Sequence, residues 1–312
     1  MTAGDGTTSA GLADADPAGV GRRVLDAWDS FLALARAVDL DSATRLPGWR
    51  AREVCVHLGA WPERAALRAI ADAARRRLPP GPPSDPDDAN ALVLGLHRAE
   101  PRTAVLGALE AARLAAADFF AAPDVADMAH RPISTPVGVL PATSAIHTIC
   151  YELAVHALDL HSAGAPPPPR QLLDAGLAAL IDVTGSLAAT GGVQLTVAAL
   201  DEDEGWRFST VARLGWHTEP VDRDSPPPLA PHSAVRGRAA ELLDISSGRA
   251  NAAVSIATRR IRVDDLPAFL RLAPLIDAAP HIPGGAALRG ATRLLRSAGG
   301  LLGRLPRPPG TY

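Results

Sequence analysis

The sequence has 312 residues, of which 47% are hydrophobic and 21% are charged. These proportions are typical of a folded protein, so a disordered chain is excluded, and the length suffices for about two domains. The formal net charge of −3 excludes the concentrated basic surface that nucleic-acid binding requires. We therefore expect a globular protein with no nucleic-acid partner.

Cysteine content and the ends of the chain predict the compartment. Cys55 and Cys150 are far apart and form no CxxC pair, so we predict two buried thiols in a reducing compartment, with a thiol-ligand role as a minor alternative. The N-terminus lacks the basic and apolar regions of a secretory signal. No uncharged apolar run approaches the roughly 20 residues of a membrane span. The expected location is cytoplasmic.

The first half of the chain has the periodicity of a helical bundle. Residues 1–16 are small and polar and are expected to be disordered. Over 17–165, apolar residues at helical spacing and breaks at proline and glycine predict four main helices, the number of a four-helix bundle. The four main helices are predicted from Pro17, at 50–77, at 102–121 and at 143–162. A short helix is expected at 89–98, with loops at 78–88 and 122–141.

The second half reads as a smaller α+β domain. Four consecutive prolines predict a stiff linker at 166–170, followed by a domain at 171–279. Residues 280–312 form a basic tail, and its amphipathic stretch 284–304 gives a weaker alternative of contact with an anionic membrane surface. The predicted elements are helices at 171–189 and 236–246, strands at 193–197, 206–211 and 252–263, and a last helix beginning at Asp264–Pro267.

The helix at 143–162 carries the most informative side chains. Glu152 and His156 are one turn apart and share the inward stripe that Leu153 and Leu160 mark. A buried carboxylate needs compensation, and carboxylate and imidazole are standard ligands of divalent metals. His57 lies in the apolar stripe of the second predicted helix, at 50–77, and supplies a third ligand. Three protein ligands leave an open position, as in catalytic sites.

A simpler interpretation stays open at this point: Glu152 and His156 bond each other, and His57 is a core histidine. Asp159 either orients a ligand or is a surface charge. His147 is either a supporting or a surface residue, and His161 is rotated away from His156. The remaining histidines are expected to be solvated; they are His97, His130, His217, His232 and His281.

Three regions of the chain resemble the mycothiol-dependent maleylpyruvate isomerase family. Leu46-Pro47-Gly48-Trp49, followed by Val54, His57 and Leu58, is similar to its "LPGW…V…HL" segment, and 152–159 is similar to its "E…VH..D" helix. Residues 235–243 and 247–249 resemble a run of its C-terminal domain. The resemblance implies a DinB-like metal-binding four-helix bundle followed by a sterol-carrier-like α+β domain.

The resemblance also implies a function. It implies zinc held by His57, Glu152 and His156, an arginine of the second domain near the metal, mycothiol or a similar thiol as cosubstrate, and a small-molecule substrate. Arg249 is the first candidate for the arginine and Arg238 the alternative.

The chain departs from the isomerase in its proline-rich insertions at 78–88 and 221–231 and in its basic tail. We therefore expect a thiol-dependent transferase or isomerase without assigning that substrate. One alternative is a binding module that holds an apolar ligand between 193–211 and the helix at 236–246 and has no open metal position. The other is an interaction protein that acts through its tail.

Overall fold

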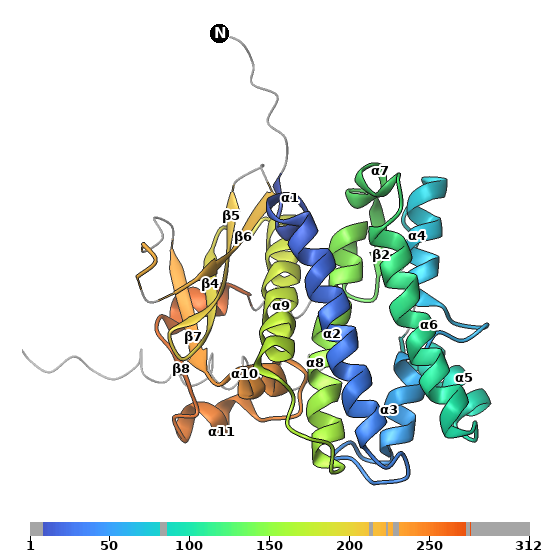
Figure 1. Ribbon diagram of the computed structural model, residues 1–312. Helices are drawn as coiled ribbons and strands as arrows, with labels where there is room; N and C mark the ends of the chain where they lie inside the picture. The colour runs from blue at the N-terminus through green and yellow to red at the C-terminus, as the bar shows by residue number, and fades with distance from the viewer. Residues whose placement is uncertain are drawn as a thin grey trace, which may run out of the picture.

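The structure is a computed structural model that describes residues 9–81, 86–211, 215–222, 224–226, 231–272 and 275. A group of helices forms one side of the molecule and a mixed sheet the other, with α9 beside the sheet and α8 next to it (Figure 1). The predicted fold class, a helical domain followed by a smaller α+β domain, is thereby confirmed. The predicted basic tail, 280–312, lies outside the described residues.

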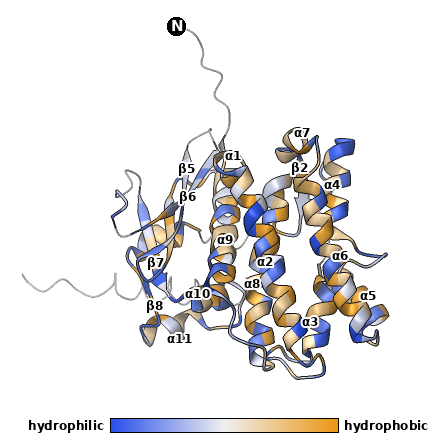
Figure 2. Cartoon of the chain, viewed as in Figure 1, coloured by the Kyte–Doolittle hydropathy of each residue, from blue (hydrophilic) through white to orange (hydrophobic). Residues whose placement is uncertain are grey.

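The helical part is built around α2, α6 and α8, whose apolar faces meet in the core. Val24, Trp28 and Phe31 of α2 are fully buried, and hydrophobic residues run along α6 and α8 (Figure 2). The Asp16 side chain caps α2 by accepting a hydrogen bond from the Gly19 amide. The helices are α2 (Pro17–Ala37), α3 (Ala51–Leu58), α4 (Ala66–Arg76), α5 (Pro86–His97), α6 (Arg102–Phe120), α7 (Val125–Ala129) and α8 (Ala142–Ser162).

Two predictions for this half were wrong. The single helix expected at 50–77 is divided into α3 and α4, because the chain turns at Gly59 and a proline follows at position 62. The loop expected at 122–141 contains α7 and a hairpin, in which β2 (Pro132–Thr135) pairs with β3 (Gly138–Pro141).

The second half places α9 (Arg170–Thr190) against a six-stranded sheet in the order β1-β6-β5-β4-β7-β8. β1 pairs parallel with β6 and β4 parallel with β7, and the other neighbours are antiparallel. The strands are β1 (Ser9–Ala10), β4 (Thr196–Asp201), β5 (Glu204–Val211), β6 (Gly215–Val221), β7 (His232–Gly237) and β8 (Ile261–Val263). The short helices are α1 (Leu12–Ala15), α10 (Ala239–Ser246), α11 (Ala252–Ala257), α12 (Leu266–Phe269) and the 3-10 helix η1 (Leu270–Leu272).

Three sequence predictions for the sheet domain and its edge need correction. The first strand begins at Thr196 rather than at 193, and β6 and β7 were not predicted beside the prolines of 221–231. The strand expected at 252–263 is a helix, α11, followed by β8. Residues 9–15, expected to be disordered, form β1 and α1 at the sheet edge. The last helix begins after Asp265, which caps it as predicted.

The two halves share one hydrophobic core, in which α8 packs along α9. By length and composition α9 is apolar enough to cross a membrane, yet 61% of its most apolar window is buried. We therefore interpret α9 as a core helix of the folded chain. The linker at 166–170 does connect α8 to α9, while its status as a domain boundary remains a prediction.

Candidate metal centre

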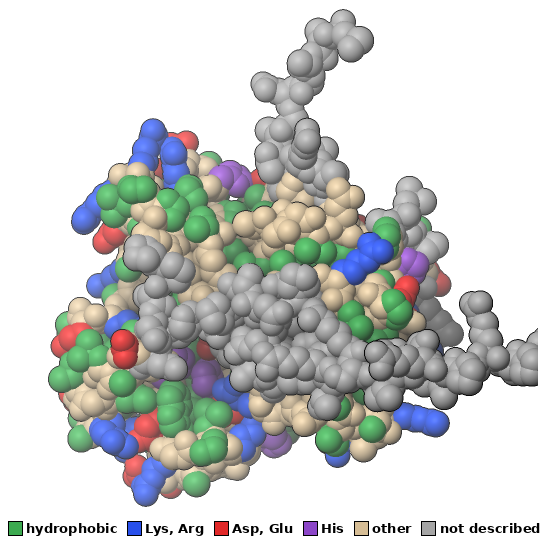
Figure 3. All heavy atoms as spheres, turned by 180° about the vertical axis from the view of Figure 1, so that it is seen from behind, with side chains coloured by type: hydrophobic (Ala, Val, Ile, Leu, Met, Phe, Trp, Pro, Cys, Tyr) green, Lys and Arg blue, Asp and Glu red, His purple; other side chains and the backbone are tan. Residues whose placement is uncertain are grey.

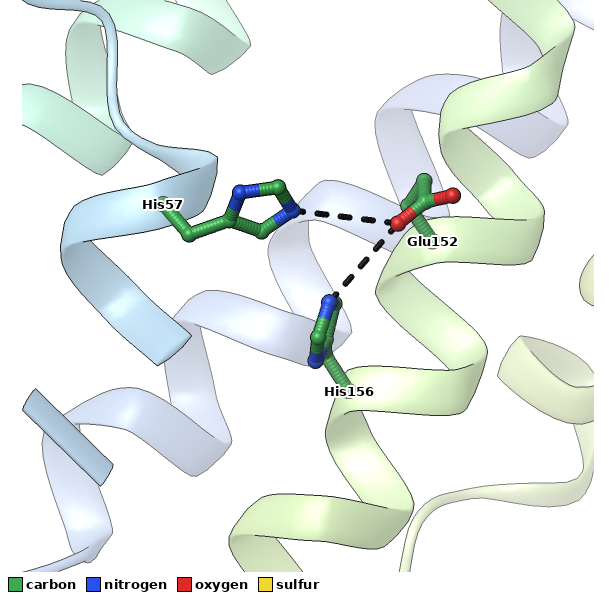
Figure 4. Close-up of side chains that lie close together, drawn as sticks. All are labelled: His57, Glu152 and His156. Atoms are coloured by element: carbon green, nitrogen blue, oxygen red, sulfur yellow. Dashed lines mark ion pairs between the residues drawn. The ribbon is translucent and has the colours of Figure 1, made fainter. Parts of the chain in front are cut away.

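Three predicted ligands converge between α3 and α8. His57 stands in the last turn of α3, and Glu152 and His156 are one turn apart on α8, with their side chains pointing toward one another (Figure 4). Glu152 Oε2 lies 3.8 Å from His57 Nε2 and 3.7 Å from His156 Nε2. One ligand atom from each residue lies within 4.8 Å of the others. The simpler interpretation, with His57 apart from the pair, does not describe this geometry.

Each histidine is oriented by an oxygen that faces its other ring nitrogen. His57 Nδ1 lies 2.9 Å from Asn90 Oδ1, and His156 Nδ1 lies 2.8 Å from Asp159 Oδ2. Because an amide oxygen and an ionised carboxylate only accept hydrogen bonds, each Nδ1 carries the proton. Both Nε2 atoms therefore present a lone pair to the space beside Glu152, as metal-binding histidines do.

The residues fit a divalent cation by donor type and spacing. Tetrahedral ligands at zinc bond lengths stand about 3.4 Å from one another, slightly closer than the separations here. The His57 and His156 side chains are 12% and 6% exposed, and Glu152 keeps 34% because it faces a cavity. A small movement of these side chains would bring all three within bonding distance of one ion.

The electrostatics of the centre favour the protonation states that bind metal. Burial lowers the pKa of His57, which favours the neutral imidazole. Burial raises the pKa of Glu152, but the groups around the carboxylate, the Arg249 guanidinium among them, outweigh that effect and leave the pKa below its ordinary value. A neutral imidazole and an ionised carboxylate are the forms that donate electron pairs to a metal.

Asp159 joins the centre to the second half of the chain. It is fully buried and accepts hydrogen bonds from His156, Arg45 and Arg249. Burial raises its pKa, but His156 and Arg249 hold the pKa well below the ordinary range. Arg45 also forms two hydrogen bonds, of 2.7 and 2.6 Å, to Asp244 of α10. Asp159 is thus a supporting residue rather than a surface charge.

The predicted arginine of the second half does approach the centre. Arg249 Nη2 lies 2.7 Å from Asp159 Oδ2, and Arg249 lines the same cavity as the three candidate ligands. The alternative, Arg238, is exposed at the start of α10 and is not among the described residues that line the cavity. The role of Arg249 in catalysis stays a prediction.

The centre opens into a large cavity. Its volume is about 1020 Å³, and it is lined by both halves of the chain. Seen from behind, histidine and arginine side chains reach the surface beside hydrophobic ones (Figure 3). Trp49 is part of the wall: its ring is stacked with His156 at 6.3 Å and meets the His57 ring edge-on at 5.6 Å. A molecule in the cavity can therefore reach the three candidate ligands.

The other histidines lie away from the centre. His147 is fully buried near Asp182, so the surface alternative is wrong, and its described contact is with Asp182 rather than with a candidate ligand. His161 faces away, as predicted, and bonds the Ala165 carbonyl. His97 was expected to be solvated, yet its side chain is 12% exposed and stacks on Trp61.

Four further histidines complete the set, of which three lie among the described residues. His130, His217 and His232 are exposed as expected. His281 lies outside the described residues.

Neither cysteine acts as a ligand in this centre. Cys55 and Cys150 are free and fully buried, and burial raises the pKa of each thiol to about 12. The thiols are therefore protonated at neutral pH and unsuited to bind metal. The prediction of two buried thiols is confirmed.

Sequence reasoning missed four residues of the site: Asn90, Arg45, Arg64 and the role of Trp49. Arg64 lines the cavity and bonds Asn90, and burial lowers its pKa. Asn90 and Arg64 come from segments without an informative motif, so no sequence signal marked them. Trp49 did belong to a recognised motif, and its contact with both histidine rings is one physical reason for a tryptophan there.

Comparison with known proteins identifies the first half. Residues 22–161 match the family described as mycothiol maleylpyruvate isomerase N-terminal domain. These residues belong to that family. The match includes all three candidate ligands and confirms the predicted resemblance. No curated protein matches the chain.

Solved structures extend the likeness to most of the chain. Two of them are crystal structures of the mycothiol-dependent maleylpyruvate isomerase, one of a histidine-to-alanine variant. Both are 15% identical, cover 83% of this chain and 98% of theirs, and have TM-scores of 0.51 and 0.50, the variant having the lower. At this identity the likeness shows a shared fold across both halves.

Proposed function

We propose that this protein is a divalent-metal-dependent enzyme that uses mycothiol or a similar low-molecular-weight thiol, as an isomerase or a transferase. The observation that supports it is the convergence of two oriented Nε2 atoms and a carboxylate oxygen at the wall of a cavity. Zinc is the metal we propose, because it suits nitrogen and oxygen ligands in this number. Membership of residues 22–161 in the isomerase domain family supports the thiol.

The residues of the centre would have different roles in such a reaction. His57, Glu152 and His156 would hold the metal with a coordination position free on the cavity side. A bound divalent metal lowers the pKa of a coordinated thiol and makes it a nucleophile at neutral pH. Arg249 lies on the same cavity and is placed to bind a carboxylate of the substrate or the thiol. Asp159 fixes both Arg249 and His156.

The two reaction types share a first step. The thiol sulfur bonds to one carbon of an electrophilic double bond, and the proton lost by the thiol ends on the neighbouring carbon. An isomerase then allows rotation about the new single bond and eliminates the thiol, which restores the double bond. A transferase releases the adduct. The chain's own residues suit either outcome, so we assign no particular substrate from the family's name.

A non-catalytic module for an apolar molecule is the second candidate. In its favour, the cavity is lined by Val197 and Ala199 of β4 and by Leu242 and Ile245 of α10, where that interpretation expected it. It also expected a metal site without an open position, whereas the same cavity reaches Glu152. We therefore favour the enzyme. We also propose that it is cytoplasmic and that its partners are small molecules.

Metal content tests the proposal directly. We expect about one zinc per chain in the purified full-length protein by mass spectrometry, and loss of that zinc in His156→Ala. Removal of one ligand of three leaves too few donors for tight binding. His217→Ala serves as the matched control, because that histidine is 48% exposed on β6 and lies outside the centre. Circular dichroism verifies the fold of each variant.

The outcomes are distinct. Zinc in the wild type and the control, with none in His156→Ala, supports the centre and justifies assays of thiols with electrophilic acids. A folded wild type that binds no zinc, even after reconstitution, contradicts the enzyme and leaves the binding module.

A further inference from the structure

We propose that the electrophile joined to the thiol carries an extended apolar body, which occupies the part of the cavity between α9 and the sheet. We call this part, lined by α9, β4, β7 and α10, the apolar chamber. The inference rests on the proposed function and adds the class of substrate. The proposed substrate is an amphiphilic acyl or aryl compound and not a short, doubly charged acid.

One face of α9 is apolar and only half-buried. Leu180, Val183, Thr184 and Leu187 follow the spacing i, i+3, i+4 and i+7, so they form one stripe, and all four line the cavity. The Thr184 hydroxyl bonds the Leu180 carbonyl at 2.7 Å and is satisfied within the helix. Other positions of α9 are tightly packed: Gly176 lies against Ala154 of α8, and Gly185 lies against Trp216 and Phe208 of the sheet. The stripe is therefore accessible because the chamber in front of it is hollow.

The facing wall of the apolar chamber is apolar as well. Val197 and Ala199 alternate along β4, and Val235 is the register partner of Ala199 on β7. Leu242 and Ile245 of α10 also line the cavity. No charged residue of α9, β4, β7 or α10 is among the described residues that line the cavity. Apolar walls of this kind select ligands by the apolar area that they bury.

The apolar chamber is continuous with the metal centre. The lining of the one cavity passes from Glu152 and His156 over Ile149 and Tyr151 of α8 to Ser246 and the residues of α10. Ser246 Oγ lies 2.9 Å from the Leu243 carbonyl, to which it donates, and 3.2 Å from the Tyr151 hydroxyl. A molecule whose reactive carbon lies near Glu152 can thus extend its body along α9.

The size of the cavity agrees with two occupants. At about 1020 Å³ it stands at the upper end of the range of roughly 300–1,000 Å³ that ordinary ligand sites span. The arginines of the lining, Arg64, Arg68 and Arg249, all lie outside α9, β4, β7 and α10. Arg64 and Arg249 bond Asn90 and Asp159 beside the metal centre, where a polar thiol finds partners. An apolar body fits the other side, because polar groups placed there would lose water without gaining hydrogen bonds.

A fluorescent fatty acid tests the proposal with a readout separate from metal and activity. We would titrate 11-(dansylamino)undecanoic acid into the full-length zinc-loaded protein and into Val183→Trp and Leu187→Trp, which fill the apolar chamber. We expect saturable blue-shifted emission for the wild type and affinities at least tenfold weaker for both variants. Among straight-chain competitors from octanoate upward, affinity should rise up to about fourfold per added methylene, as burial of one methylene predicts.

The matched control is Val254→Trp, the same substitution at a residue 55% exposed on α11 and outside the described cavity lining. It should bind the probe within twofold of the wild type. Zinc content should be unchanged in all three variants, so a failure here leaves the metal centre intact. Either no saturable binding to zinc-loaded wild type, or equal binding by folded Val183→Trp and Leu187→Trp, overturns the apolar chamber as the substrate site.

Discussion

Two histidines with defined tautomers are the basis of the metal centre. His57 and His156 come from different helices, and each directs Nε2 toward Glu152 because an oxygen occupies the hydrogen-bond position at Nδ1. For His57 that oxygen belongs to Asn90 of α5, 33 positions along the chain. Supporting contacts of this kind set both the orientation and the basicity of a ligand.

Asn90→Ala tests this support. Without the acceptor, the His57 ring is free to rotate or to take the other tautomer, so we expect zinc affinity to fall by about 10- to 100-fold while the fold is kept. Competition with a chromophoric zinc chelator at pH 7 measures the change.

Asn90→Asp provides the rescue, because it restores an oxygen opposite His57 Nδ1 and keeps the partner of Arg64. Its zinc affinity should return to within a few-fold of the wild type. Equal zinc affinity in Asn90→Ala and the wild type would show that packing alone orients His57.

At the scale of elements, the approach of α8 to α9 brings the two halves of the chain together. A Cβ atom placed on Gly176 of α9 would lie 2.5 Å from the Ala154 Cβ of α8, closer than carbon atoms pack. Ala154 is on the same helix as Glu152 and His156. Glycine at this position therefore helps to set the distance between the metal centre and the sheet domain.

Gly176→Ala should accordingly destabilise the protein. Overpacking at a rigid helix contact costs about 1–3 kcal/mol, more than the gain in helix propensity. Gly107→Ala on α6 is the matched control, because nothing lies within 4 Å of its added Cβ, and we expect it to stabilise by about 0.5–1 kcal/mol. Urea unfolding of both variants gives the comparison. A stabilised Gly176→Ala would show that the helices separate at no cost.

Helices could be predicted from the sequence better than the breaks between helices and the pairing of strands. Apolar periodicity located α2, α8 and α9 to within a few residues, since each buries one face along its length. The same signal ran through Gly59 and merged α3 with α4, because both helices keep an apolar stripe. The pairing of Ser9 and Ala10 with β6 joins residues some 200 positions apart, which no local pattern encodes.

For the candidate site, too, local spacing could be predicted from the sequence and long-range contacts could not. Glu152 and His156 share a helix, so their proximity follows from a spacing of four residues. His57 could be predicted as a third ligand only from its position in an apolar stripe together with the family resemblance. Asn90 reaches the centre through tertiary packing alone, and nothing in its sequence surroundings distinguishes it from a surface residue. Arg45 directly precedes the Leu46–Trp49 segment, but its partners Asp159 and Asp244 lie 114 and 199 positions away, so no local pattern predicts these contacts.

At the scale of the whole molecule, Asp182 ties the N-terminal segment to α9 and the sheet. Its fully buried carboxylate accepts hydrogen bonds from the Leu12 amide at 3.0 Å, Trp216 Nε1 at 3.0 Å and the Thr218 hydroxyl at 2.7 Å. Burial raises the pKa of Asp182, but His147 and these donors outweigh it and hold the pKa below the ordinary value. Protonation is therefore harder in the folded chain than in the unfolded chain.

Asp182→Asn should lower the free energy of unfolding by about 1–3 kcal/mol at pH 7, because the neutral amide is a weaker acceptor and presents donors to a site that already supplies them. The difference from the wild type should be full above about pH 5, where Asp182 is ionised in both folded and unfolded chains. The difference should shrink as the pH falls below about 4 and then passes the lowered pKa of Asp182 in the folded chain. Protonation there removes the negative charge of Asp182 from the wild type as well. Urea unfolding at pH 7, 5 and 3 measures this, with Asp72→Asn on the exposed surface of α4 as the control. A difference that stays constant down to pH 3 would mean that the shape of the residue, and not its charge, holds the N-terminal segment to the sheet.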